Sequence, residues 1–350
     1  MIEKVFYNFK PLSDPIPIAE QKWPEGITPL VHTQTMTYNH GNFIRECIEG
    51  ILIQKTTFPV QILIHDDDST DNTAEIVNEY QKNYPNLIKA YYQIENSYTK
   101  LDKHERRSEF MNWKKGKYEA FCEGDDYWTD PLKLQKQVDF LEENPGYVLT
   151  GGYASQIYEH ENFEIFHDKP IHDQNFDFDD RYIHERNPIF ALTMLFRYNI
   201  IKEFPDIYWK LGGGTRRLYF LLCQHGKGRY IHENYGVYRT HSGGVTFNTK
   251  WTTEGKIGKY ENYIVASIKW NNYFHGKYDK ETKNVLHING IRIIKLLLSD
   301  KKLFEAAKYT DFISINYIER FRYKLPAIFL KYVLGMFVIK KQLICRKLIL

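Results

Sequence analysis

The sequence predicts an α/β fold: a mostly parallel sheet with helices on both faces, followed by a helical C-terminal extension. Two observations lead to this prediction. Short apolar runs typical of strands alternate along the 350-residue chain with segments whose apolar residues recur at helical spacing. Three of the apolar runs also end in clusters of polar side chains, and ligands of such sheets bind at the carboxyl ends of the strands.

The first 150 residues show the clearest alternation. Residues 1–26 contain four prolines and no regular pattern, so we expect an irregular N-terminal arm there. The strands are expected at Leu30–Met36, Val60–Ile64, Leu87–Tyr92 and Lys117–Cys122. The helices between them are expected at residues 43–52, at residues 72–80 with Asn72 as the cap, and between Pro131 and Asn144.

The rest of the chain is irregular at first and then helical. From Gly151 to about His184 the sequence is aromatic and without a clear period, and a strand is expected at Ile189–Phe196. A helix is expected from Arg216 to about His225, and the chain beyond Trp251 has mainly helical spacing. We therefore expect three parts: the arm (1–26), a main domain (27–250) and a helical C-terminal region (251–350).

Polar residues follow three of the predicted strands. Tyr38 and Asn39 follow the first, Asp66–Asp68 follow the second, and Glu123–Asp126 follow the fourth. Because the carboxyl ends of parallel strands meet at one edge of a sheet, these three clusters are expected to converge.

The net charge of +3 hides an acidic body and a basic tail. From Arg320 to Leu350 there are eight basic and no acidic residues, whereas residues 1–319 have a net charge of −5. Since the excess of basic residues lies in an apolar tail, nucleic-acid binding is not expected. The four cysteines form no CxxC or zinc spacing, and the N-terminus lacks the apolar core of a signal peptide, so we expect reduced thiols in a cytoplasmic protein.

The basic amphipathic tail, residues 320–350, has two interpretations. Its apolar stretch, Leu325–Ile339, is 15 residues long and is too short for the ~20 residues that span a bilayer. A helix lying at the inner face of the cell membrane, drawn to anionic lipid, is one interpretation. A helix packed on the main domain with a basic exposed face is the other.

The acidic cluster CEGDDYW, residues 122–128, is the most informative motif. Glu123, Asp125 and Asp126 repel one another unless a cation lies between them. Oxygen ligands at this density suit Mn²⁺ or Mg²⁺, and those ions usually bind together with a phosphate. On these residues alone, a solvated acidic turn is the alternative.

Four segments resemble, in order and spacing, the family 2 glycosyltransferases. They are TYNHGNFIRECIEGILIQ (37–54), HDDDSTDNT (65–73), GKYEAFCEGDDYWTDPLKLQKQVDFL (116–141) and YRTHSGG (238–244). The resemblance covers roughly residues 28–248. It implies the Rossmann-like GT-A fold and a nucleotide-diphosphate sugar as the donor substrate.

The resemblance assigns residues to the nucleotide and to the metal. The nucleotide would be bound by Thr37, Tyr38, Asp67, Asn96, Glu123 and Asp125. Asp67 suits this role because a carboxylate accepts hydrogen bonds from a base N–H or from ribose hydroxyls. Where the family has glycine after its aspartate pair this chain has Asp68, so the turn is expected to differ locally.

Glu123 and Asp125 occupy the DxD positions of the family, with glutamate replacing the first aspartate. Together with Asp126 they would hold the Mn²⁺ or Mg²⁺ ion that neutralises the departing diphosphate, with Asp125 as the principal ligand. Arg239 and His241 match a family segment that closes over the diphosphate, and both are expected to act in catalysis.

Inverting members of the family have an aspartate base at a position that falls at about Thr215 in this chain. Threonine cannot serve as that base, and three explanations remain open. Another carboxylate is the base, with Asp206, Glu203 and Glu233 as candidates and Asp206 as the one we assign. Alternatively, the acceptor is already ionised and is bound by Arg216 and Arg217, or the protein binds a nucleotide sugar without turnover.

The predicted activity is metal-dependent, inverting sugar transfer in surface polysaccharide synthesis. A UDP-sugar is the favoured donor, and a glycan or lipid-linked oligosaccharide is the acceptor. A nucleotide-sugar-binding pseudo-glycosyltransferase is the main alternative. A nucleotidyltransferase is a further alternative, but it would need a glycine-rich phosphate loop, which TMTYNHGNF (35–43) does not form.

Overall fold

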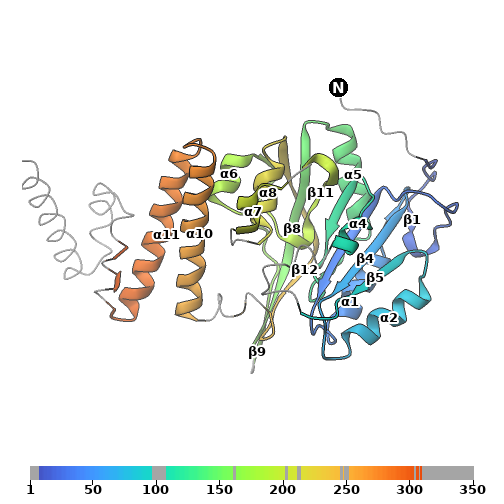
Figure 1. The fold of residues 1–350 in the computed structure, drawn as a ribbon, viewed down its shortest axis with the longest axis horizontal. Coiled ribbons are helices and arrows are strands. Elements are labelled where there is room, and N and C mark those ends of the chain that lie inside the picture. Colours follow the sequence, from blue (N-terminus) through green and yellow to red (C-terminus); the bar gives the residue numbers. More distant parts are fainter. Residues whose placement is uncertain are drawn as a thin grey trace, which may run out of the picture. The chain divides into compact units, whose positions relative to one another are not determined.

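The computed structural model describes residues 8–96, 108–160, 163–201, 204–210, 214–244, 247, 252–302, 305–306 and 308–309. The chain divides into two compact units (Figure 1). The first comprises residues 1–204 and 215–244, and the second comprises residues 205–214 and 245–350. All three polar clusters that follow the predicted strands lie in the first unit.

The core of the first unit is, among the described residues, a ten-stranded mixed and mostly parallel sheet. The strand order is β10-β12-β8-β11-β6-β2-β4-β5, with β7 beside β12 and β9 beside β8. The strands are β2 (Val31–Thr37), β4 (Val60–Asp66), β5 (Ile88–Tyr92), β6 (Tyr118–Phe121), β7 (Tyr127–Trp128), β8 (Tyr147–His160), β9 (Phe163–His167), β10 (Phe176–Phe178), β11 (Leu195–Arg197) and β12 (Lys227–Thr240).

The strands β6, β2, β4 and β5 run parallel to one another, and β12 runs parallel to β8. The register pairs Thr37 at the end of β2 with Asp66 at the end of β4. The backbone of Gly124, just beyond β6, donates to the carbonyl of Met36 over 3.0 Å. The prediction that the three polar clusters share one edge of the sheet is therefore confirmed.

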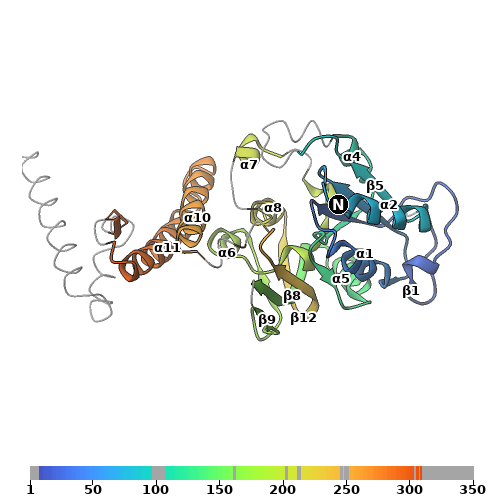
Figure 2. The same ribbon diagram turned by 90° about the horizontal axis from the view of Figure 1, so that it is seen from below.

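Helices cover both faces of this sheet, as predicted. They are α1 (Ile44–Leu52), α2 (Thr73–Asn83), α4 (Ser108–Asn112), α5 (Lys133–Glu143), α6 (Asp180–Glu185) and α8 (Arg216–Leu222). The helices α1 and α5 lie on one face and α4 lies on the other (Figure 2). The side chains of β4 therefore point alternately to the two faces. Ile62 and Ile64 join the core under α1, whereas His65 packs against Phe110 of α4.

Two predictions in the second half of the sheet were wrong. The segment from Gly151 to His184 was expected to be irregular, but it contains most of β8, all of β9 and β10, and α6. A strand was expected at Ile189–Phe196, but a 3₁₀ turn, η2 (Ala191–Thr193), occupies its middle and β11 is short. The strand β8 was missed because glycines interrupt the alternation of polar and apolar residues. They are needed for close packing: a Cβ on Gly152 would lie 2.5 Å from the carbonyl oxygen of Glu233.

The described part of the N-terminal arm is more regular than expected. It contains β1 (Ile16–Pro17), which pairs antiparallel with β3 (Lys55–Thr56), and the 3₁₀ turn η1 (Ile18–Glu20). Ile18 is buried, and its backbone N–H donates to the carbonyl of Gln54 over 2.8 Å.

A third 3₁₀ turn, η3 (Tyr198–Ile200), follows β11.

The second unit contains α7 (Asp206–Lys210), α10 (Thr253–Tyr273) and α11 (Asp279–Ser299). The last two pack together around Ile264, Ile293 and Leu297. The expected helical character beyond Trp251 is confirmed for this part of the chain, and the basic tail, residues 320–350, lies outside the described residues. Within the described ranges, every helix is too short or too polar to cross a bilayer.

Candidate nucleotide and metal site

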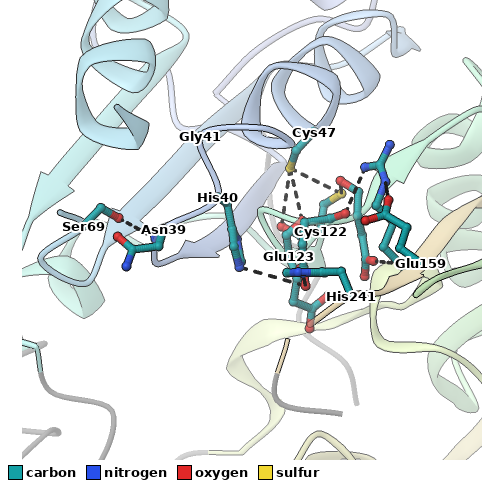
Figure 3. Close-up of polar contacts among 12 residues, drawn as sticks. Asn39, His40, Gly41, Cys47, Ser69, Cys122, Glu123, Glu159 and His241 are labelled. Carbon is teal, nitrogen blue, oxygen red and sulfur yellow. Dashed lines mark hydrogen bonds and ion pairs between the residues drawn. The ribbon is translucent and has the colours of Figure 1, made fainter. Parts of the chain in front are cut away.

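The site is built from the loops that follow β2, β4 and β6. The first two loops are tied together by Asn39, which adopts φ +54°. Its backbone N–H donates to Oγ of Ser69 over 2.9 Å, and its side-chain oxygen accepts from the backbone of Thr70 over 2.8 Å (Figure 3). These bonds hold the backbone just before His40 against the second loop.

The second loop begins with a turn closed by Asp66. This buried carboxylate accepts from the backbone and the hydroxyl of Ser69, and burial raises its pKa. Asp68 has φ +66°, in the left-handed region that glycine favours and that aspartate tolerates better than most residues. Asp68 therefore adopts a backbone conformation that glycine would also take.

The residues predicted to bind the nucleotide lie close together. The backbone N–H of Asp67 donates to the carbonyl of Thr37 over 3.0 Å. The carbonyl of Asp67 accepts from the amide of Asn96, also over 3.0 Å. Tyr38 follows Thr37 and is 43% exposed, so its ring is accessible for stacking. The structure brings these four residues together, and their role in binding stays a prediction.

Gly124 allows the third loop to press against the first. A Cβ on Gly124 would lie 2.7 Å from Oγ1 of Thr37 and 2.8 Å from Nδ1 of His40. Real Cβ atoms do not approach other atoms so closely. Glycine is therefore the residue that the EGDD motif needs at this position.

Asp125 faces two histidines. Its Oδ2 lies 3.2 Å from Nε2 of His241 and 4.0 Å from Nε2 of His40, and Figure 3 shows both rings directed into the same space. Burial alone would raise the pKa of Asp125, but the hydrogen bond with His241 and the nearby His40 hold it below its usual value. Burial lowers the pKa of His40, which favours the neutral ring that ligates metals.

Glu123 and Asp126 have different surroundings from Asp125. Asp126 is 1% exposed, and its Oδ1 accepts from the backbone of Arg239 over 2.8 Å. Burial, followed by the charges of Asp125 and Glu123, raises its pKa well above the usual range. Burial and the charge of Asp125 raise the pKa of Glu123 to about 7. Asp126 thus fixes β12 at the site, while Asp125 offers an oxygen to the histidines.

Arg239 is held by protein groups. Its guanidinium donates to the carbonyl of Asp125 over 3.0 Å, forms an ion pair with Glu46 and lies 3.9 Å from Glu159. It also stacks 4.6 Å from the ring centre of Tyr127. These contacts connect β12 to α1 and to the third loop, and the expected catalytic role of Arg239 stays a prediction.

Thr215, at the position where the sequence comparison with the family expected a base, is the N-cap residue of α8. One turn further, Tyr219 is fully buried, and its pKa is raised by burial and then by the charge of Glu123. The Tyr219 hydroxyl therefore feels the charge of the acidic loop. Arg216 donates to the carbonyls of Ile183 and His184, so its guanidinium holds the end of α6.

The candidate bases lie in different places. Glu233 forms an ion pair with Lys136 over 2.6 Å and precedes His241 by eight residues on an extended strand, a distance on the order of 20 Å. Asp206 is the first residue of α7 in the second unit, and its role stays a prediction. Glu203 lies outside the described residues.

His40 is the residue at this site that was not predicted. The ligand atoms of His40, Asp125 and His241 all lie within 4.8 Å of one another. The available signal was position, since His40 lies four residues after the first predicted strand, Leu30–Met36, at the edge where the acidic clusters were expected. One carboxylate and two imidazoles so close together form a donor set that fits a divalent cation.

Comparison with known proteins identifies the family to which this fold belongs. Residues 35–202 match the model for glycosyl transferase family 2, and this part of the chain belongs to that family. It is 40% identical over 125 residues to the uncharacterized protein Rv1520 of Mycobacterium tuberculosis, covering 36% of this chain and 35% of that protein. It is 32% identical over 126 residues to the putative teichuronic acid biosynthesis glycosyltransferase TuaG of Bacillus subtilis, covering 36% of this chain and 47% of TuaG. The chain thus matches less than half the length of these relatives.

Two solved structures show the same fold. One is TarS of S. aureus in complex with UDP-GlcNAc, with a TM-score of 0.53 at 14% identity, covering 81% of both chains. The other is the mannosyltransferase PcManGT of Pyrobaculum calidifontis in complex with GDP-Man and Mn²⁺, with a TM-score of 0.51 at 13% identity, covering 94% of this chain and 87% of that one. The predicted GT-A fold is confirmed.

Proposed function

We propose that this protein transfers a sugar from a UDP-sugar to a glycan or a lipid-linked oligosaccharide in the synthesis of a surface polymer, with inversion at the anomeric carbon. One observation supports the proposal above the others. The nucleotide loop around Asp67 and the Asp125–His241 pair converge at one edge of the sheet, as a diphosphate bound between them requires. The similarity to TuaG and to TarS with UDP-GlcNAc favours this donor and this type of product.

The donor would be bound by the first two loops. Asp67 and Asn96 are linked through the carbonyl of Asp67 and would hold the base and the ribose. Asn39 fixes the first loop to the second, so the site is preorganised before the donor arrives. Tyr38 offers an exposed ring against which the base would stack.

The proposed activity includes dependence on a divalent cation, which Asp125 and His241 would hold. The 3.2 Å separation of their facing atoms is close to the ~3 Å between neighbouring ligands of a small divalent ion. Such an ion supplies positive charge that stabilises the departing diphosphate. The Mn²⁺ in the PcManGT complex supports this part of the proposal.

The acceptor side carries a second candidate function. Because the family resemblance places the base at about Thr215, which cannot serve as one, a protein that binds a nucleotide sugar without turnover is the alternative. For the active enzyme we assign the base to Asp206. Alanine at Asp206 should then lower transfer by about 100-fold while donor binding is kept.

The experiment that tests the proposed function measures binding and turnover separately. Thermal unfolding of the full chain is followed with UDP-, GDP- and dTDP-sugars, with and without Mn²⁺, and nucleotide release is then assayed. We expect a stabilisation of a few kcal/mol by a saturating UDP-sugar, and release of UDP. Asp67→Ala should abolish the stabilisation, whereas the exposed control Asp173→Asn should keep it.

Each other outcome has a defined meaning. Stabilisation without UDP release, also in the presence of candidate glycan acceptors, would favour the binding protein. No response to any nucleotide sugar would refute the proposed function.

Membrane attachment is tested in a separate experiment. Deletion of residues 320–350 should release the protein from vesicles that contain anionic lipid.

A further inference from the structure

We propose that His40 is a third protein ligand of the metal, and that the resulting set of two imidazoles and one carboxylate selects a first-row transition ion over Mg²⁺. This inference rests on the proposed function for the presence of a metal at the donor diphosphate. It adds a ligand from the first loop and a choice between the two ions that the acidic motif alone leaves open.

The geometry places three ligand atoms around one point. Oδ2 of Asp125 lies 3.2 Å from Nε2 of His241 and 4.0 Å from Nε2 of His40, and the ligand atoms of the three residues lie within 4.8 Å of one another. An octahedral ion with ligands at about 2.1 Å separates adjacent ligand atoms by about 3 Å and opposite ones by about 4.2 Å. Side-chain movements of less than about 1 Å therefore convert the observed arrangement into a ligand set.

His40 is held in this position from both sides. The preceding Asn39 is bonded to the second loop, and the backbone N–H of the following Gly41 donates to Asp71 over 2.9 Å. The carbonyl of His40 accepts from the backbone of Ile44 over 2.8 Å, at the start of α1. A loop fixed so closely presents its imidazole in a defined direction, as a metal ligand requires.

Unpaired buried polar atoms also lie beside the three ligands. Within the described residues, three buried side-chain atoms here have no hydrogen-bond partner: Oγ1 of Thr37, Nδ1 of His40 and Oε2 of Glu123. The first two lie within 2.8 Å of the point where a Cβ of Gly124 would be. Thr37 is 3% exposed, so bulk water does not satisfy its hydroxyl. These two atoms lie toward Gly124, away from Nε2 of His40, so a metal at Nε2 would not pair them. Oε2 of Glu123 is a buried carboxylate oxygen without a partner, and a cation in the acidic loop would offset its negative charge.

The types of donor atom decide which cation is preferred. Imidazole nitrogen suits first-row transition ions, whereas Mg²⁺ prefers oxygen ligands and keeps several of its waters. With Asp125 alone, Mg²⁺ and Mn²⁺ would both be acceptable. With His40 and His241 added, two of the three protein donors are nitrogen atoms, which favours Mn²⁺ and the later ions of the series.

The test measures metal binding directly in the full chain, with and without UDP. The protein is treated with EDTA, and free Mn²⁺ is followed by its EPR signal during titration, with Mg²⁺ as the competitor. Visible absorption of bound Co²⁺ reports nitrogen ligation. We expect wild type to bind Mn²⁺ at least about 10-fold more tightly than Mg²⁺, and His40→Ala to weaken Mn²⁺ binding by at least about 10-fold.

Two further variants distinguish a ligand from a structural role. His40→Asp replaces nitrogen by oxygen, so it should bind metal but lose most of the preference for Mn²⁺ over Mg²⁺. The exposed residue His225 gives a matched control, and His225→Ala should behave as wild type. Circular dichroism and Tm show whether each variant folds.

The inference is overturned if His40→Ala binds Mn²⁺ as wild type does while His241→Ala does not, and in that case the proposed function stands. Equal affinity of wild type for Mn²⁺ and Mg²⁺ also overturns it. If wild type binds neither metal, even with UDP present, and no nucleotide sugar stabilises it, the proposed function itself fails. The failures of the two proposals are therefore distinguishable.

Discussion

Nε2 of His241 lies 3.2 Å from Oδ2 of Asp125, although the two residues are 116 positions apart. The contact depends on the neighbouring pair, because Asp126 accepts from the backbone of Arg239 and so holds the end of β12 beside the acidic loop. The side chain of Arg239 adds a bond to the carbonyl of Asp125. Asp126 of the EGDD motif thus positions the end of β12, and Asp125 contacts His241, which directly follows that strand.

This relationship predicts a selective loss of activity. His241→Ala should lower donor turnover by about 100-fold or more. The variant removes one of the two residues proposed to hold the cation that stabilises the departing diphosphate. Tm should stay close to that of wild type, since the β12 backbone remains bonded to Asp126. The measurement is UDP release at saturating donor, with His225→Ala as the control. Retention of more than about a tenth of the wild-type rate would contradict the assignment.

The glycine of the EGDD motif allows a second prediction. Gly124→Ala places a methyl group 2.7 Å from Oγ1 of Thr37 and 2.8 Å from Nδ1 of His40, so the first and third loops must separate. We expect a loss of about 1–3 kcal/mol in the free energy of unfolding and a large loss of turnover. Gly146→Ala is the matched control, because a Cβ there meets nothing within 4 Å. Urea unfolding of both variants tests the prediction, and equal stabilities would refute it.

The first half of the fold was predictable because local sequence patterns determine its strands and helices. Val60–Asp66 is a mostly apolar run, interrupted by Gln61, that ends in acids, and such a run predicts a buried parallel strand without knowledge of its neighbours. Its length also places Asp66 and Asp67 at the sheet edge. By contrast, β8 contains Gly151 and Gly152, which allow close packing against Ile189 and β12, respectively. The local sequence does not show these long-range contacts.

The site was predictable only where chemistry and motif coincided. Asp125 stands out because three acids cluster in one loop, but His40 has no such neighbour in sequence. Its proximity to Asp125 arises from the packing of Gly124 against the first loop. The same packing brings Cys47 and Cys122, which are 75 positions apart, to a sulfur–sulfur distance of 3.7 Å. Pairs of this kind are consequences of tertiary structure.

The raised pKa of Glu123 predicts a pH-dependent cost to stability in the absence of metal. The folded protein holds this proton up to a pKa of about 7, whereas the ordinary value of glutamate is 4.5. Between pH 4.5 and 7 the folded state therefore binds more protons than the unfolded state, and stability falls as the pH rises. Glu123→Gln removes this effect.

In EDTA, the variant should match wild type near pH 4.5 and exceed it at pH 7.5 by on the order of 1 kcal/mol. Thermal or urea unfolding at both pH values measures the difference. Glu143→Gln, an exposed change on α5, is the control and should show no such trend. A Glu123→Gln curve parallel to that of wild type across this range would show that burial does not perturb the carboxyl group.

Lys133 predicts the opposite pH trend. Its side chain is fully buried, its Nζ donates to Gln137 over 2.9 Å and lies 4.1 Å from the ring centre of Trp128, and burial lowers its pKa to about 7. Between pH 7 and 10.5 the unfolded chain binds a proton that the folded chain lacks, so this residue makes stability rise with pH. Lys133→Met should therefore be more stable than wild type at pH 7, and the difference should shrink toward pH 10 as the cost of deprotonation disappears. Urea unfolding at the two pH values, with the exposed Lys82→Met as the control, measures the difference, and a gap that is independent of pH would mean that Lys133 stays protonated in the fold.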